Sequence, residues 1–169
     1  GLFVLAGWAL DIAEIKTVFP GLVTMKANTA LGFVLAGTAL FLHLQTPGWQ
    51  RLATVFALLS LLIGVATLAE YLFGWQLGVD QLFFLETNHL PSSAIPGRMS
   101  IYTAIAFCAS GFALLALPNL KIRRLVQLAA GVTLLIGVVS LLAYLWNISA
   151  IIDGSRFTPV ALHTALAFT

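Results

Sequence analysis

An acidic residue inside an apolar stretch has the clearest potential for chemistry in this sequence. Glu70 lies near the end of the apolar run Leu52–Phe73. A carboxylate in a membrane helix is costly, and by default it marks a functional site that needs a partner. Arg98 in the following loop is a candidate partner, and Asp80 is a second acid in that loop. We predict a ligand-binding site at Glu70, Asp80 and Arg98; alternatively, Glu70 only reaches headgroups or water.

Three polar residues at matching positions indicate a second candidate site. Asn28, Tyr102 and His163 each precede the threonine of a phrase that occurs three times. Different polar side chains at equivalent positions can surround one small ligand near the outer surface. We therefore predict these three as further ligand-binding residues.

The repeated phrase itself sets the architecture. It consists of threonine, alanine, two more residues and phenylalanine, at Thr29–Phe33, Thr103–Phe107 and Thr164–Phe168. A second phrase, Leu61–Tyr71, returns as Leu134–Tyr144, and Gly1–Trp8 fits the same frame weakly. Repeats indicate copies of one structural unit. The sequence predicts helical hairpins of one kind, used about three times, over approximately 1–44, 52–117 and 125–169.

Small residues dominate these phrases. They let membrane helices approach closely, and a threonine hydroxyl can bond to a neighbouring helix or to its own. The phrases therefore predict helix-packing contacts, which we expect at Thr29, Gly32, Thr103, Ala106 and Thr164.

Other kinds of chemistry are not indicated. The three histidines are scattered, the single Cys108 lies mid-span as an apolar filler, and metal, phosphate-loop, dinucleotide and nucleophile-elbow motifs are absent. We expect no catalytic residue, no metal and no cofactor, and hence no enzymatic activity in this chain. A pI near 9.0 reflects a few loop cations and no nucleic-acid-binding surface.

The composition indicates the solvent in which these elements fold. The chain is 60% hydrophobic and 8% charged, whereas soluble domains carry about 25% charged residues. About 20 apolar residues cross a bilayer as a helix. Continuous rather than alternating apolar runs favour helices over barrel strands. Four runs are long enough: Met25–Leu44, Leu52–Phe73, Met99–Leu117 and Leu125–Trp146.

The two ends of the chain resemble parts of further spans. Gly1–Leu10 has no basic segment of a signal peptide, and Val160–Thr169 begins like the other helices. We expect truncated spans, with short interfacial helices as the alternative. The prediction is an all-α, polytopic transmembrane bundle of about six spans in a single membrane domain, 1–169.

Loop charges predict the orientation. The short loops Gln45–Arg51 and Pro118–Arg124 contain basic and no acidic residues, so the positive-inside rule places them in the cytoplasm. The longer loops face outward and both truncated ends lead to the cytoplasm, as expected for a multi-pass protein of a bacterial inner membrane. The longest loop, Gly74–Arg98, is predicted to be an amphipathic interfacial segment or a ligand-binding lid.

The stretch Glu70–Phe83, with Gly-Val-Asp-Gln at 78–81, and the stretch Pro96–Ser100 resemble the N-terminal membrane module of bacterial sensor proteins. In that family a multi-span region precedes PAS domains and a histidine kinase or a diguanylate cyclase. The likeness runs from about Met25 to Phe168; Ile101-Tyr102 replaces the family's usual Pro-Asn. It implies signal transduction in which an outer or intramembrane stimulus reaches a cytoplasmic output domain after Thr169. The expected partners are the bilayer, a second copy through the full-length protein and an unknown small ligand.

Two other functions remain open. A transporter or channel can be built from such repeats, although no span here is broken by Gly-Pro and the span centres carry no charge. A purely structural anchor that dimerises an output domain also fits the sequence.

Overall fold

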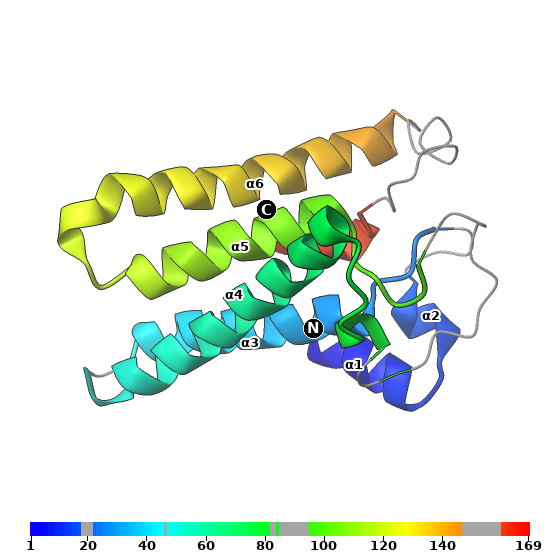
Figure 1. Ribbon diagram of the computed structural model, residues 1–169, viewed down its shortest axis with the longest axis horizontal. Helices are drawn as coiled ribbons and strands as arrows, with labels where there is room; N and C mark the ends of the chain where they lie inside the picture. Colours follow the sequence, from blue (N-terminus) through cyan, green and yellow to red (C-terminus); the bar gives the residue numbers. More distant parts are fainter. Residues whose placement is uncertain (18–21, 46, 82–83, 85–94, 147–159) are drawn as a thin grey trace.

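The fold is known from a computed structural model, which describes residues 1–17, 22–45, 47–81, 84, 95–146 and 160–169. Within these ranges every regular element is helical, which confirms the all-α class. The α-helices are α1 (Leu2–Ala9), α2 (Ala13–Lys16), α3 (Ala27–His43), α4 (Gln50–Phe73), α5 (Ile101–Ala116), α6 (Arg123–Leu145) and α8 (Leu162–Phe168) (Figure 1). Three 3₁₀ turns accompany them: η1 (Pro47–Trp49), η2 (Val79–Gln81) and η3 (Leu120–Ile122).

Four helices form the body of the molecule. Helices α3 to α6 lie side by side in chain order, while α1 packs on α3 and α8 packs on α6 (Figure 1). The ends of α3 to α6 agree with the four predicted apolar runs to within two residues. The turns η1 and η3 lie at one end, which we call the basic end because it carries Arg51, Lys121, Arg123 and Arg124. We call the opposite end, where α3, α5 and α8 begin, the loop end.

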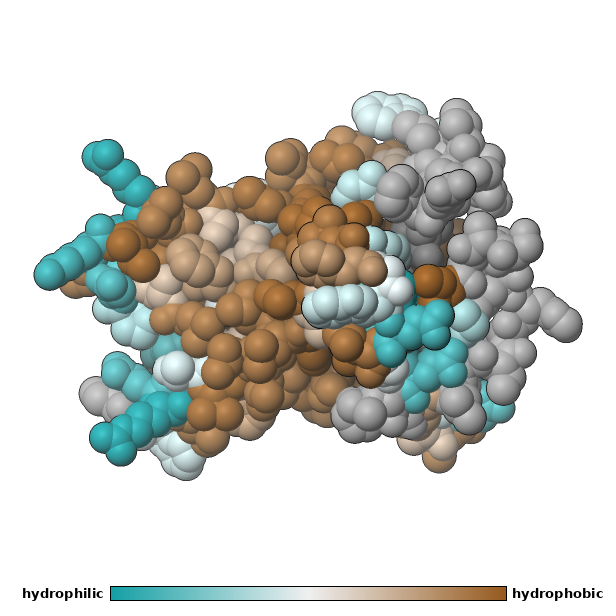
Figure 2. All heavy atoms as spheres, viewed as in Figure 1, coloured by the Kyte–Doolittle hydropathy of each residue, from teal (hydrophilic) through white to brown (hydrophobic). Residues whose placement is uncertain are grey.

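Two helices are long and apolar enough to cross a membrane. They are α4, with 24 residues, and the segment Leu120–Leu145 that contains α6. At about 1.5 Å per residue, α4 is about 36 Å long. Large apolar side chains on both helices face outward; Leu62 is 50% exposed and Leu135 is 61% exposed. Figure 2 shows apolar atoms covering the middle of the molecule and polar atoms gathered toward its ends. This arrangement indicates membrane association, since such surfaces are costly in water.

A glycine contact recurs in three helix pairs at the loop end. In each pair, a glycine within the first helix or at its N-cap lies against the carbonyl oxygen of the alanine in the repeated phrase. A Cβ at that glycine would lie 2.7, 2.8 or 3.0 Å from the oxygen, so no larger residue fits without displacement. The pairs are Gly1 with Ala30, Gly64 with Ala104, and Gly137 with Ala165.

A hydrogen bond from an aromatic side chain to the backbone recurs in the same three pairs. A ring N–H or O–H near the end of the first helix donates to a backbone carbonyl just before the second helix. The bonds are Trp8 Nε1 to Met25 O at 3.0 Å, Tyr71 Oη to Met99 O at 3.0 Å, and Tyr144 Oη to Val160 O at 2.6 Å. We call these three bonds the aromatic tethers. They fix how the chain returns from one helix of each pair to the next.

The phenylalanines of the three phrases meet in the core. Ring centroids of Phe33 and Phe107 lie 5.0 Å apart, those of Phe33 and Phe168 4.6 Å, and those of Phe107 and Phe168 5.3 Å. Such separations suit tilted and edge-to-face aromatic packing. Helices α3, α5 and α8 therefore converge on one aromatic centre, through residues that the sequence places at equivalent positions.

Candidate functional site

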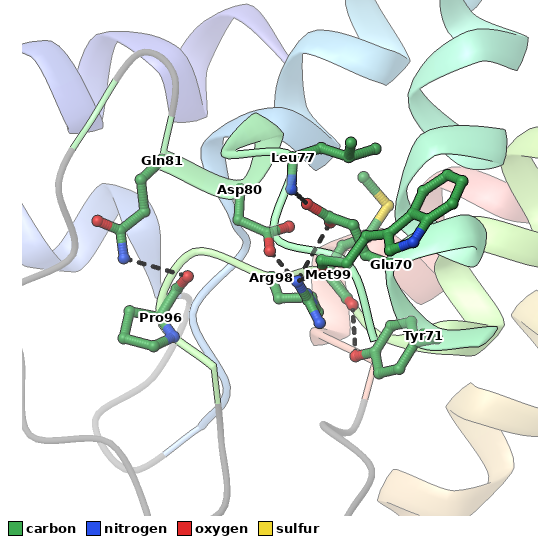
Figure 3. Close-up of polar contacts among 9 residues, drawn as sticks. Glu70, Tyr71, Leu77, Asp80, Gln81, Pro96, Arg98 and Met99 are labelled. Atoms are coloured by element: carbon green, nitrogen blue, oxygen red, sulfur yellow. Dashed lines mark hydrogen bonds and ion pairs between the residues drawn. The ribbon is translucent and has the colours of Figure 1, made fainter. Parts of the chain in front are cut away.

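Arg98 is the centre of a buried charged cluster at the loop end (Figure 3). Its Nε donates to Asp80 Oδ2 at 2.6 Å, and its Nη2 lies 3.4 Å from Glu70 Oε2. The side chains of Glu70 and Arg98 are 0% and 5% exposed, and that of Asp80 is 7% exposed. The structure therefore brings together the three residues predicted as the first ligand-binding site. It also shows that Glu70 is a buried member of an ion-pair network and does not reach solvent.

The end of α4 provides one side of this cluster. Gly74 ends the helix in the left-handed conformation, with φ of 67°, which glycine adopts without a Cβ penalty. The chain then turns back, so that the backbone N–H of Leu77 donates to Glu70 Oε1 at 2.9 Å. The short turn η2 follows and presents Asp80 to Arg98.

The segment before α5 provides the other side. Gly97 has φ of 74°, and a Cβ there would overlap the carbonyl of Asp80, so this close approach requires glycine. Gln81 Nε2 donates to Pro96 O at 3.3 Å and joins the two segments (Figure 3). The specific pairing of Gly-Val-Asp-Gln with Pro-Gly-Arg thus corresponds to a packed contact between two segments.

Arg98 also reaches the aromatic tether of this helix pair. Its guanidinium lies 5.4 Å from the ring centroid of Tyr71, and Nη2 donates to the carbonyl of Trp75 at 3.4 Å. The arginine therefore contacts the last turns of α4, the loop and η2, and its own backbone leads directly into α5. A displacement of any of these elements must change the contacts of Arg98.

The charges of the cluster do not balance. Two carboxylates face one guanidinium, which gives a net charge of −1 when all three groups are ionised. Glu70 Oε2 and Asp80 Oδ1 are buried and have no hydrogen-bond partner within the described ranges. Buried charges are stable only when paired and hydrogen-bonded. These two oxygens can accept a proton or a hydrogen-bond donor from a ligand.

A similar but smaller arrangement lies at the connection from α1 to α3. Lys16 is buried, lies 4.7 Å from the ring centroid of Trp8 and bonds to Asp11 at 2.5 Å. The nearby ammonium lowers the pKa of the exposed Asp11 carboxyl. Lys16 and Arg98 are therefore both buried cations on the ring of an aromatic tether.

The three residues of the second predicted set differ in their surroundings. Asn28 is buried, Tyr102 is 51% exposed, and His163 lies against the backbone of Ile15 and Lys16. The following threonines, Thr29, Thr103 and Thr164, instead line one small cavity. A step of one residue turns a side chain by about 100° around a helix, which explains why neighbours in sequence face different surroundings.

The residues predicted for helix packing lie in close contacts. A Cβ at Gly32 would lie 2.6 Å from the ring of Phe107, and Ala106 is fully buried. The carbonyls of these two positions accept equivalent hydrogen bonds, from Ser60 Oγ at 3.3 Å and from Thr133 Oγ1 at 3.4 Å.

Sequence reasoning missed several parts of the site. The aromatic tethers were present in the repeat as Tyr71 and Tyr144, but no role was assigned to them. The Leu77 N–H and the Trp75 carbonyl are backbone groups, which leave no signal in residue types. The predicted interfacial or lid segment falls mainly on residues 82–83 and 85–94, outside the described residues.

Comparison with known proteins assigns no function to this charged cluster. No protein-family model matches the chain, and no curated protein and no solved structure is significantly similar to it. Among the described residues, no three of the types His, Cys, Asp and Glu are grouped so that they could hold a metal ion. The charged cluster of Glu70, Asp80 and Arg98 is therefore the best candidate site.

Proposed function

We propose that the chain is the membrane sensory input module of a bacterial signalling protein. It passes a stimulus from the outer side of the membrane, or from within the bilayer, to a cytoplasmic output domain. The observation that carries this proposal is the position of Arg98. One buried side chain joins the outer loop to the end of α4 and to the start of α5.

The proposed architecture is a multi-pass bundle of about six spans in the inner membrane, built from three hairpins of one kind. The basic end faces the cytoplasm, in agreement with its four arginines and lysines, and the loop end faces outward. The three equivalent glycine contacts and aromatic tethers support the repeat. In this orientation, the charged cluster lies on the side where an external ligand arrives.

The signal is a change of pairing within the cluster. A ligand donor, or a proton, that binds Glu70 or Asp80 weakens the hold of that carboxylate on Arg98. Neutralising one acid leaves Arg98 paired with the other acid, so two pairings of similar energy are available and a ligand that prefers one of them shifts the packing arrangement. Helix α4 transmits the change because Gly64 lies against the backbone of Ala104 and Cys108 on α5.

The positions of the charged residues favour sensing over transport. Within α3 to α6, Asp, Glu, Lys and Arg occur only near helix ends, whereas a transporter typically holds its substrate near the middle of the bilayer. If the chain is a purely structural anchor, output should not depend on the charged cluster. Substitutions in the cluster therefore distinguish the anchor from a sensor.

The test uses the full-length gene product in membranes, with its phosphorylation or cyclic-dinucleotide output measured. Glu70→Gln and Arg98→Gln should each change the basal output or its response at equal membrane expression. Arg51→Gln, at the basic end, is the matched control and should leave output unchanged. Output equal to wild type in both cluster variants would overturn the sensory proposal and favour the structural anchor.

A further inference from the structure

An open apolar groove lies between α3 and α5 at the end of α8. Its volume is about 320 Å³, and Ala167 and Phe168, the last two residues of α8, belong to its lining. Two of its walls are equivalent in the repeat, because α3 and α5 contribute residues at the same places: the phenylalanine of the phrase and the third and seventh residues after it. They are Phe33, Ala36 and Leu40 on α3, and Phe107, Ser110 and Leu114 on α5.

Helix α6 forms a further wall, and its groove face differs from the same face of α4. In the register of the second phrase, Ala57 and Leu61 on α4 correspond to Ala130 and Leu134 on α6. Ala57 is fully buried in a helix that packs against both α3 and α5, whereas Ala130 is exposed and lines the groove. Leu61 is partly buried, whereas Leu134 is 48% exposed. Among the described residues, this face of α6 therefore has less cover than the equivalent face of α4.

The cover on α4 comes from the second half of α5. Gly111, the fourth residue after Phe107, lies so close to α4 that a Cβ there would be 2.9 Å from backbone atoms of Leu61. Helix α8 already holds the third equivalent place at its start, since the ring of Phe168 packs in the aromatic centre. A helix that continues in this direction passes along the groove and brings its fourth residue after Phe168 against Leu134.

We propose that the groove holds the continuation of α8 in the full-length protein, as an apolar helix that packs on α6 in the way that α5 packs on α4. The third and seventh residues after Phe168 then face α3 and α5, and the fourth is glycine or alanine, like Gly111. Small residues in the walls, such as Ala36 and Ala130, allow such a close approach of helices within a membrane. This inference rests on the proposed function in one respect only, because the chain must continue beyond Thr169.

Cross-linking in the full-length protein tests this position directly. In a Cys108→Ser background, Leu114→Cys is combined with a cysteine at the seventh residue after Phe168, and a protease site is inserted after the exposed Asn119. After oxidation in membranes and cleavage, the two fragments should migrate together and separate on reduction. Phe112→Cys replaces Leu114→Cys in the control, because Phe112 is 40% exposed and is not part of the groove lining, and its fragments should separate without reductant.

Leu40→Cys, at the equivalent place on α3, should give the same result and guards against distortion by one substitution. At normal membrane expression, absence of a cross-link from both positions, or a cross-link that joins two copies of the chain, would overturn the proposal in favour of lipid or of a second copy in the groove. A proline or a charged residue at the third or seventh position in the full gene also contradicts it. The output of Glu70→Gln tests the sensory role separately, so either proposal can fail alone.

Discussion

The hydroxyl of Tyr71 donates a hydrogen bond to the carbonyl oxygen of Met99 at 3.0 Å, so α4 is fastened at the loop end to the chain that enters α5. Met99 is 1% exposed, and the same ring lies beneath the guanidinium of Arg98. One aromatic side chain therefore supports both the helix connection and the charged cluster.

Loss of this tether should loosen the connection between α4 and α5. Tyr71→Phe keeps the ring but leaves the buried Met99 carbonyl without its donor, so we expect a loss of about 0.5–1.5 kcal/mol of stability. The decrease in Tm in detergent measures it. Tyr102→Phe is the matched control, because that side chain is 51% exposed, and its Tm should equal the wild-type value. Equal effects of the two substitutions would contradict a structural role for the tether.

The charged cluster should respond differently to the loss of its cation and of one acid. Arg98→Gln leaves two buried carboxylates unpaired, for which about 3–5 kcal/mol of destabilisation is expected. Glu70→Gln removes the excess negative charge, and its amide oxygen can still accept from the Leu77 N–H. Its effect on stability should therefore be small. Chemical or thermal unfolding of both variants gives the ranking, and a larger loss for Glu70→Gln is the contrary result.

The close packing at Gly32 should not tolerate a larger side chain. Gly32→Leu drives a side chain into the ring of Phe107, and overpacking costs about 1–3 kcal/mol. Thr29→Val should cost less, since hydrogen bonds between membrane helices average about 0.6 kcal/mol. Gly37→Leu is a control on the same helix, because no atom lies within 4 Å of a Cβ at Gly37. If Thr29→Val lowers Tm more than Gly32→Leu, the repeated phrase is not chiefly a packing device.

The orientation can be measured in intact cells. In a Cys108→Ser background, a cysteine at Leu77 should react with a membrane-impermeant maleimide, and a cysteine at Leu120 should react only after the cells are opened. Both side chains are exposed, at 51% and 81%, so burial does not explain a difference in labelling. The opposite pattern reverses the proposed orientation and places the charged cluster in the cytoplasm.

The helices were predictable because each apolar run is continuous and ends at a clear punctuation residue, such as Gly74 after α4. The pairing of Glu70 with Arg98 was predictable because a buried carboxylate requires a cation and Arg98 was the cation of the facing loop. Each of these features follows from the residue type alone and from the free-energy cost of burying or exposing that side chain.

The cavity among the three threonines was not predictable in the same way. The repeat made Thr29, Thr103 and Thr164 equivalent, but equivalence along the chain does not show which helix face turns inward. Tyr102 illustrates the difficulty, because it is adjacent to buried Thr103 and is itself largely exposed. The tethers end on backbone carbonyls, which every residue has, so no pattern of side chains indicates the acceptor.

Because each tether ends on a backbone carbonyl, each helix connection can tolerate mutation at the acceptor position. The acceptor is the main chain of Met25, Met99 or Val160, so mutation can change the side chain there without removing the bond. The donor tolerates exchange between an indole N–H and a phenol O–H, as Trp8 and Tyr71 show. The side chains of the three loop-end connections can thus change widely, while the same polar contact continues to hold each connection in place.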